Sequence, residues 1–60
     1  MVIEVFLDNT LLDQRDFEVP PRVGDHLTLS ANEHYRVEQC RHVRNNRNGR
    51  YEYQVRVTRV

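Results

Sequence analysis

The stretch Tyr51-Glu52-Tyr53-Gln54-Val55-Arg56-Val57-Thr58, near the end of a 60-residue chain, carries the strongest structural signal in the sequence. Apolar and polar side chains alternate along it, which is typical of a β-strand with one buried face. Asn48-Gly49 stands just before this stretch, and both residues accept the positive φ angles that tight turns require. We therefore expect the stretch to be the second arm of a β-hairpin.

The residues before the turn predict the first arm of that hairpin. Tyr35, Val37 and Val43 share one parity along the chain, but the polar residues Gln39 and Arg41 interrupt the pattern. A β-bulge near Gln39 would turn the polar pair outward. We therefore expect one long strand with an irregularity at that point.

The register of the hairpin depends on the length of its loop. A two-residue turn at Asn48-Gly49 would place apolar and polar residues on the same face of the sheet. A three-residue loop that ends on the glycine pairs Asn46 with Arg50 and Val43 with Tyr53 instead. We expect the three-residue loop, with Val43 and Tyr53 as a buried pair across the two strands.

The start of the chain predicts one clear strand and one ambiguous segment. Residues 2 to 7 are apolar and rich in β-branched side chains, and turn-forming Asp8-Asn9-Thr10 follows them. Residues 10 to 17 fit either an extended segment or one helical turn near residues 10 to 16, capped by Thr10 with Asp13 three positions on. We favour the extended segment, continued by Phe17-Glu18-Val19, which alternates like a short strand.

The middle of the chain predicts a further clear strand. Pro20-Pro21 ends any strand before it, because proline has no N–H donor. Val23-Gly24-Asp25 then turns the chain into residues 27 to 31, where Leu and Ala alternate with Thr and Ser. Residues 30 to 34 are long enough only for a tight connection to the hairpin.

Four to five short strands in a single domain, residues 1 to 60, predict an all-β fold, a small antiparallel meander that curls into an open barrel. Pro20-Pro21-Arg22-Val23-Gly24-Asp25, followed by an alternating strand, a tight turn and Tyr35-Arg36-Val37 at the start of a longer strand, resembles the small SH3-like barrels of short bacterial and phage proteins. The resemblance covers residues 17 to 60 and implies the fold. It implies no particular activity, because such barrels bind nucleic acids, bind proteins or serve as virion and assembly parts.

Charge is distributed unevenly along the chain. Residues 1 to 35 carry two Arg and seven Asp or Glu, whereas residues 36 to 60 carry seven Arg and two Glu. The net charge of zero is therefore the sum of −5 in the first part and +5 in the second. The chain has no Lys, and the planar guanidinium group suits carboxylate, phosphate or an aromatic face. Several arginines flank or occupy the loop Asn45-Asn46-Arg47-Asn48-Gly49, with Arg47 at its expected tip. We expect the partner-binding residues to be Arg41, Arg44, Asn46, Arg47, Asn48 and Arg50.

Cys40 and His42 are two residues apart and would share one face of a strand. A zinc site requires four ligands in a recognisable spacing, and one Cys with three scattered His does not supply it. Side chains at this spacing stand about 6 to 7 Å apart, which is too far for His42 to activate the thiol. We expect Cys40 to be a small, half-buried hydrophobic residue.

The carboxylates and glycines do not indicate catalysis either. Acid–base chemistry on a substrate requires two carboxylates that flank a cleft, and a 60-residue barrel has little room for one. Gly24 and Gly49 belong to separate turns and cannot form a phosphate-binding loop. We expect no enzyme activity, no cofactor and no metal site.

Together these features predict a non-enzymatic interaction module that binds a protein partner or itself through the Arg-rich hairpin; the alternative is a nucleic-acid-binding domain that uses the same hairpin. The apolar set is small, which favours self-association, with a dimer as the first expectation. The single cysteine, the lack of a signal-peptide pattern and the lack of an apolar run of about 20 residues predict a cytoplasmic protein outside the membrane.

Overall fold

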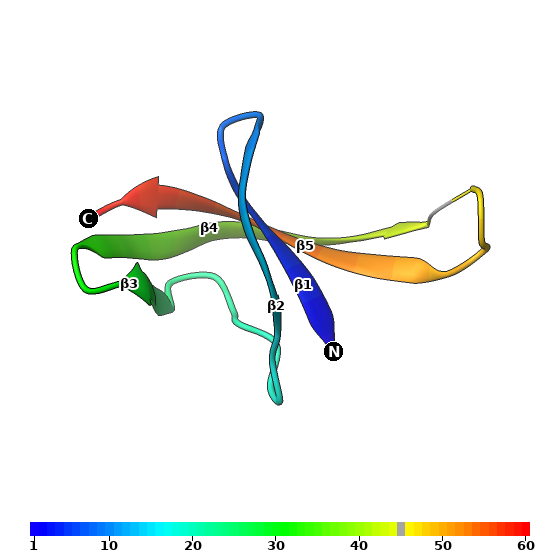
Figure 1. Cartoon of the computed structure of the whole chain (residues 1–60), viewed down its shortest axis with the longest axis horizontal. Coiled ribbons are helices and arrows are strands. Elements are labelled where there is room, and N and C mark those ends of the chain that lie inside the picture. Colours follow the sequence, from blue (N-terminus) through cyan, green and yellow to red (C-terminus); the bar gives the residue numbers. More distant parts are fainter. Residues whose placement is uncertain (45) are drawn as a thin grey trace.

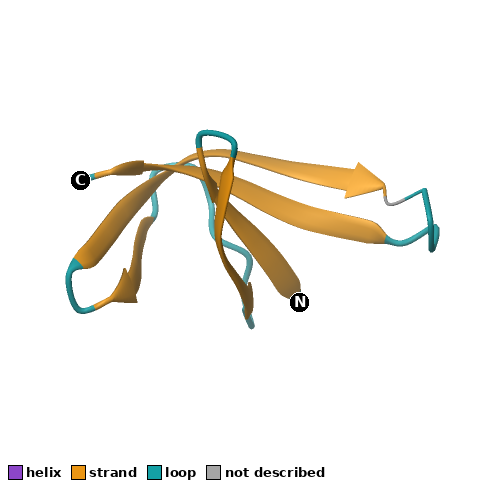
Figure 2. Cartoon of the chain, turned by 45° about the horizontal axis from the view of Figure 1, so that its top comes forward, coloured by secondary structure: helices purple, strands orange, loops and turns teal. Residues whose placement is uncertain are grey.

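The computed structural model describes residues 1 to 44 and 46 to 60, which form five β-strands and no helix. The strands are β1 (Val2–Leu7), β2 (Thr10–Asp16), β3 (His26–Ser30), β4 (Glu33–Arg44) and β5 (Tyr51–Arg59). They make one sheet in the order β2-β1-β5-β4-β3, which curls into a half-barrel (Figure 1, Figure 2). The predicted all-β open barrel is confirmed. No helix in the described part of the chain is long and apolar enough to cross a membrane.

One strand pairing differs from the antiparallel meander that we expected. β1 and β5 run parallel, with Ile3 opposite Tyr53 and Val5 opposite Val55, while the other neighbouring strands are antiparallel. This pairing places the first strand next to the last one in the middle of the sheet. Strands β2 and β3 are therefore the two edges.

The core is small and lies on one face of the sheet. Its buried apolar side chains are Ile3, Val5, Tyr35, Val37, Val55 and Val57. They come from the three central strands, where alternate residues point inward. Half-buried side chains surround them: Leu7, Leu12, Phe17, Leu27, Leu29, Cys40 and Tyr53.

The bulge predicted near Gln39 is confirmed, since the pairing of β4 with β5 shifts between Val37 and Gln39. The expected hairpin register is wrong. Val43 lies opposite Glu52 rather than Tyr53; β4 ends at Arg44 and β5 begins at Tyr51. Asn45, which we expected to begin the loop, lies outside the described residues.

The physical reason for the register is the bulge itself. Its extra residue changes which parity faces inward, so Cys40 and His42, rather than Val43, share the face of Val55 and Tyr53. The rings of His42 and Tyr53 meet edge to face, with centroids 4.7 Å apart and an interplanar angle of 72°. An aromatic pair thus occupies the position where we expected Val43.

The extended reading of residues 10 to 16 is confirmed by β2, but residues 17 to 19 are not a strand. They begin a loop that runs to β3. This loop is fixed by Gly24, whose φ angle is +95° and whose N–H donates to the carbonyl of Val37 at 2.9 Å. The Asp25 carboxylate accepts from the N–H of Arg22 at 2.8 Å, so the Gly-Asp turn does introduce the next strand. That strand ends at Ser30, and Ala31 belongs to the following turn.

Arg15 links the two edges of the sheet. Its Nη2 donates to the carbonyl of Leu29 at 2.7 Å and its Nη1 lies 3.4 Å from the carbonyl of Thr28, both on β3. Its Nε donates to the Asp13 carboxylate at 2.6 Å. Edge strands present unpaired backbone groups, and this side chain satisfies two of them on β3.

Candidate interaction surface

The hairpin of β4 and β5 extends beyond the rest of the sheet. β3 pairs with β4 only as far as Arg36, and β1 pairs with β5 only from Tyr53 onward. Residues 41 to 44 and 46 to 52, which we call the hairpin arm, therefore have few neighbours besides each other. Figure 1 shows the arm reaching away from the other strands along the long axis of the molecule.

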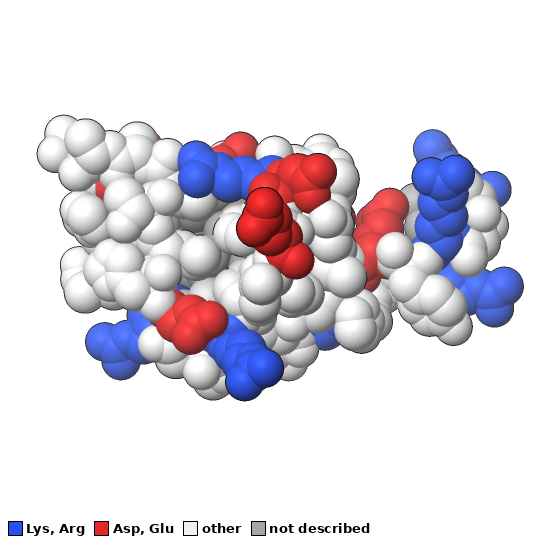
Figure 3. Space-filling model, turned by 90° about the horizontal axis from the view of Figure 1, so that it is seen from below, with Lys and Arg blue, Asp and Glu red and all other residues white. Residues whose placement is uncertain are grey.

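The six predicted partner-binding residues all lie exposed on this arm. Figure 3 shows arginine side chains, in blue, gathered at the end of the molecule that carries the loop. Arg41 donates from Nε to the side-chain oxygen of Gln54 at 3.1 Å, across the two strands. Asn48 has a structural role, because its Oδ1 accepts the backbone N–H of Arg50 at 2.9 Å and so shapes the loop.

Arg44 and Arg50 form no ion pair in the part of the chain that the structure describes. The acidic residues Asp13 and Asp16 pair instead with Arg15 and the N-terminal ammonium group, each at 2.6 Å. Neither the Arg44 nor the Arg50 guanidinium group is thus in an ion pair with a carboxylate among the described residues. Guanidinium groups placed in this way suit a negatively charged partner.

Tyr51 on the arm and Tyr53 just beyond it have different surroundings. Tyr51 is 73% exposed and lies opposite Arg44 on the neighbouring strand. Tyr53 is half-buried, and its hydroxyl donates to the carbonyl of Pro21 at 3.3 Å. The adjacent Cys40 thiol and the partial burial raise the pKa of Tyr53. Tyr51 is thus available to a partner, whereas Tyr53 stabilises the fold.

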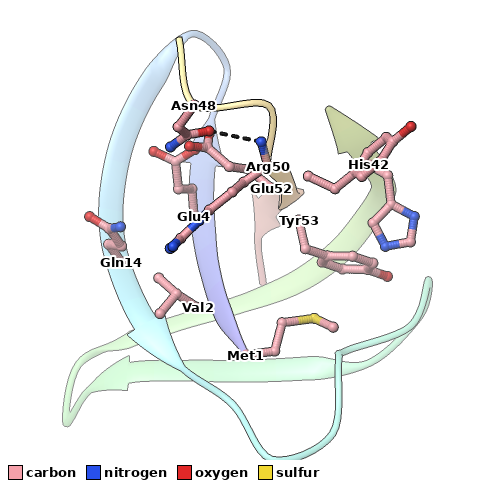
Figure 4. Close-up of a pocket in the computed structure, with 10 residues that line it drawn as sticks. Met1, Val2, Glu4, Gln14, His42, Asn48, Arg50, Glu52 and Tyr53 are labelled. Atoms are coloured by element: carbon pink, nitrogen blue, oxygen red, sulfur yellow. Dashed lines mark hydrogen bonds between the residues drawn. The ribbon is translucent and has the colours of Figure 1, made fainter. Parts of the chain in front are cut away.

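A groove of about 370 Å³ separates the arm from the N-terminal strands. Figure 4 shows that residues from β1, β2 and the arm converge on it. Its lining consists of Met1, Val2, Glu4, Gln14, His42, Asn48, Arg50, Tyr51, Glu52 and Tyr53. Sequence reasoning missed this groove, because no local pattern reveals that β1 lies beside β5.

Cys40 behaves as the small, half-buried residue that we expected. Its thiol lies 3.4 Å from the carbonyl of Pro21, to which it donates, while His42 turns its ring toward Tyr53. Within residues 1 to 44 and 46 to 60, no group of three or more His, Cys, Asp or Glu side chains is placed to hold a metal ion. The contacts of Cys40 and His42 with Pro21 and Tyr53 therefore contribute to packing.

No known protein family matches the chain, and no curated protein or solved structure is significantly similar to it. The resemblance to SH3-like barrels stays a prediction.

Proposed function

We propose that this chain is a non-enzymatic interaction module whose hairpin arm binds an acidic protein surface, with a second copy of the chain as the first candidate. The observation that carries the proposal is the exposure of Arg44 and Arg50 on a projecting arm without an ion pair in the described chain. Six buried apolar side chains make a thin core, so burial of further surface between copies would add stability. A reducing cytoplasmic setting suits the single free Cys40.

A second copy offers the complementary charge. Residues 1 to 35 carry five more acidic than basic side chains, and residues 36 to 60 carry the opposite excess. Contacts between an arm and the acidic half of another copy would bring these charges together. Such exposed contacts weaken as salt concentration rises, because counterions screen them.

The test compares two triple variants with the same change in charge. Arg44, Arg47 and Arg50 are replaced by Ala in the arm variant, and Arg36, Arg56 and Arg59 are replaced in the body variant. Sedimentation equilibrium of the unchanged chain should show a dimer or larger species at micromolar concentration. The arm variant should remain folded and sediment as a monomer, slightly lighter than the 7.3 kDa of the unchanged chain, while the body variant should still associate.

Two results would reject self-association through the arm. One is a monomer of the unchanged chain up to several hundred micromolar. The other is an equal loss of association in both variants, which would show that net charge rather than the arm is responsible. An arm variant that unfolds would identify its arginines as structural residues instead.

The exposed ring of Tyr51 favours one alternative, a nucleic-acid-binding surface on the same arm. This ring lies opposite Arg44 and next to Arg50, and single-stranded nucleic acids bind through stacking on aromatic rings combined with phosphate contacts. An NMR titration with short single-stranded and duplex oligonucleotides tests this alternative. Tyr51→Ala should abolish single-strand binding, and binding should weaken steeply with salt. Absence of shifts on the arm at low salt would reject it.

A further inference from the structure

Two histidines lie side by side at the other end of β4 from the hairpin arm. His26 Nε2 on β3 is 3.2 Å from His34 Nδ1 on β4, and the ring centroids are 5.4 Å apart. Both side chains are exposed, because their neighbours Leu27 and Tyr35 point to the core and leave the histidines on the opposite face. The hydroxyl of Thr28 lies 3.3 Å from the same Nδ1.

The distance between the two nitrogens is that expected for two ligands of one metal ion. Imidazole nitrogens bind zinc at about 2.0 to 2.1 Å, so two of them at tetrahedral or square-planar angles lie about 2.8 to 3.4 Å apart. The observed 3.2 Å falls inside this range. In the structure the two nitrogens share a hydrogen bond, and a metal ion would replace its proton. The ion would lie to one side of the line between the nitrogens, and the exposed rings can rotate to face it.

The sheet fixes this arrangement before any ligand arrives. His26 pairs with Arg36 and Thr28 pairs with His34, so the two histidines occupy diagonal positions of an antiparallel ladder. A two-residue turn joins the strands, and their pairing shifts only between Thr28 and Ser30, beside that turn. Long side chains reach across such a diagonal, and little conformational freedom would be lost on chelation.

We propose that His26 and His34 form a two-imidazole site for a divalent transition-metal ion of the copper, nickel or zinc type. Water molecules complete the coordination, because no third His, Cys or carboxylate joins the pair among the described residues. The site is therefore open and exchangeable rather than structural. Arg36 stands directly opposite His26, and its positive charge lowers the affinity. This inference is independent of the hairpin arm.

Titration calorimetry of the intact chain with Cu²⁺, Ni²⁺ and Zn²⁺, with Mg²⁺ as the hard-ion control, measures the affinity. We expect one ion per chain, with Cu²⁺ bound most tightly and Mg²⁺ not bound. His26→Asn and His34→Asn should each lower the affinity about tenfold or more, because one imidazole ligand is removed. NMR should show the largest shifts at the same two histidines.

Variants of His42, Cys40 and Arg36 test whether the ion binds at this pair of histidines. His42→Asn removes a histidine that faces Tyr53, so it should leave the affinity unchanged. Arg36→Gln should raise the affinity by removing the opposing charge. The proposal is overturned if His26→Asn binds as tightly as the unchanged chain, or if His42→Asn or Cys40→Ser lowers the affinity as much as His26→Asn does.

Discussion

Arg15 shows how one side chain can hold an open sheet together. Its guanidinium reaches from β2 to two carbonyls of β3 and to the Asp13 carboxylate of its own strand. The strands that it joins are the two edges of the sheet, which do not pair with each other. The acidic residue Asp13 is thereby committed to the fold and is not part of a free acidic surface.

Replacing Arg15 by Ala should therefore lower the free energy of unfolding by about 1.5 to 2 kcal/mol, the lower part of the range for hydrogen bonds that involve a charged group, because the site is partly exposed. Arg56→Ala removes an exposed arginine from β5 and should cost no more than about 0.5 kcal/mol. Urea unfolding of both variants measures the difference. Equal costs would show that the contacts between β2 and β3 contribute nothing to stability.

The ion pair between Arg15 and Asp13 makes the free energy of unfolding depend on pH in acid. The hydrogen bond from Arg15, followed by that from the Gln14 N–H, lowers the pKa of Asp13 below its usual value of 3.8. A carboxyl whose pKa is lowered on folding stabilises the folded state above its unfolded pKa, and this contribution disappears as pH falls through the folded pKa. Stability should thus decline below about pH 4, and Asp13→Asn should flatten that decline. An identical pH profile for the variant and the unchanged chain would contradict this assignment.

The β4–β5 hairpin shows how far local patterns can be read from the sequence. The alternation of residues 51 to 58 predicted β5, and the polar interruption at Gln39 predicted the bulge. The register was predicted wrongly because Val43 was assigned to the same face as Tyr35 and Val37. Beyond the bulge the even-numbered residues Cys40 and His42 lie on that face instead. A bulge can be located from sequence more easily than its effect on the residues beyond it.

The groove beside the arm was not predictable for a different reason. It depends on the parallel pairing of β1 with β5, which brings Val2 and Glu4 near Tyr51 from the far end of the chain. Periodicity reports which face of a strand is buried but not which strand lies next to it. The arginines of the arm, in contrast, were found from sequence because they cluster around a loop.

The hairpin register can be tested by two truncations on the same strand. Val37→Ala empties a fully buried position and should cost about 2 to 3 kcal/mol, while Val43→Ala, at a half-buried position opposite Glu52, should cost less than about 1 kcal/mol. Thermal or urea unfolding gives both values, and NMR contacts between His42 and Tyr53 report the register directly. Similar large costs at both sites would support the register in which Val43 faces the core.

At the scale of the whole molecule, a thin core and separated charges make stability depend on association. A 60-residue domain has a free energy of unfolding of about 3 to 9 kcal/mol, so contacts between copies would change it measurably. Association that occurs only in the folded state raises the unfolding temperature as protein concentration increases. Because exposed charges are screened by salt, this dependence should be strongest at low ionic strength.

We therefore expect the unfolding temperature of the unchanged chain to rise with concentration between micromolar and several hundred micromolar in dilute buffer, and to rise less in high salt. The arm variant, with Arg44, Arg47 and Arg50 replaced by Ala, should show no concentration dependence at either ionic strength. The body variant, with Arg36, Arg56 and Arg59 replaced, should behave like the unchanged chain, because its arm is intact. Scanning calorimetry over a concentration series measures all three. A concentration dependence that persists unchanged in the arm variant would place the contact between copies elsewhere, with the exposed edges β2 and β3 as the remaining candidates.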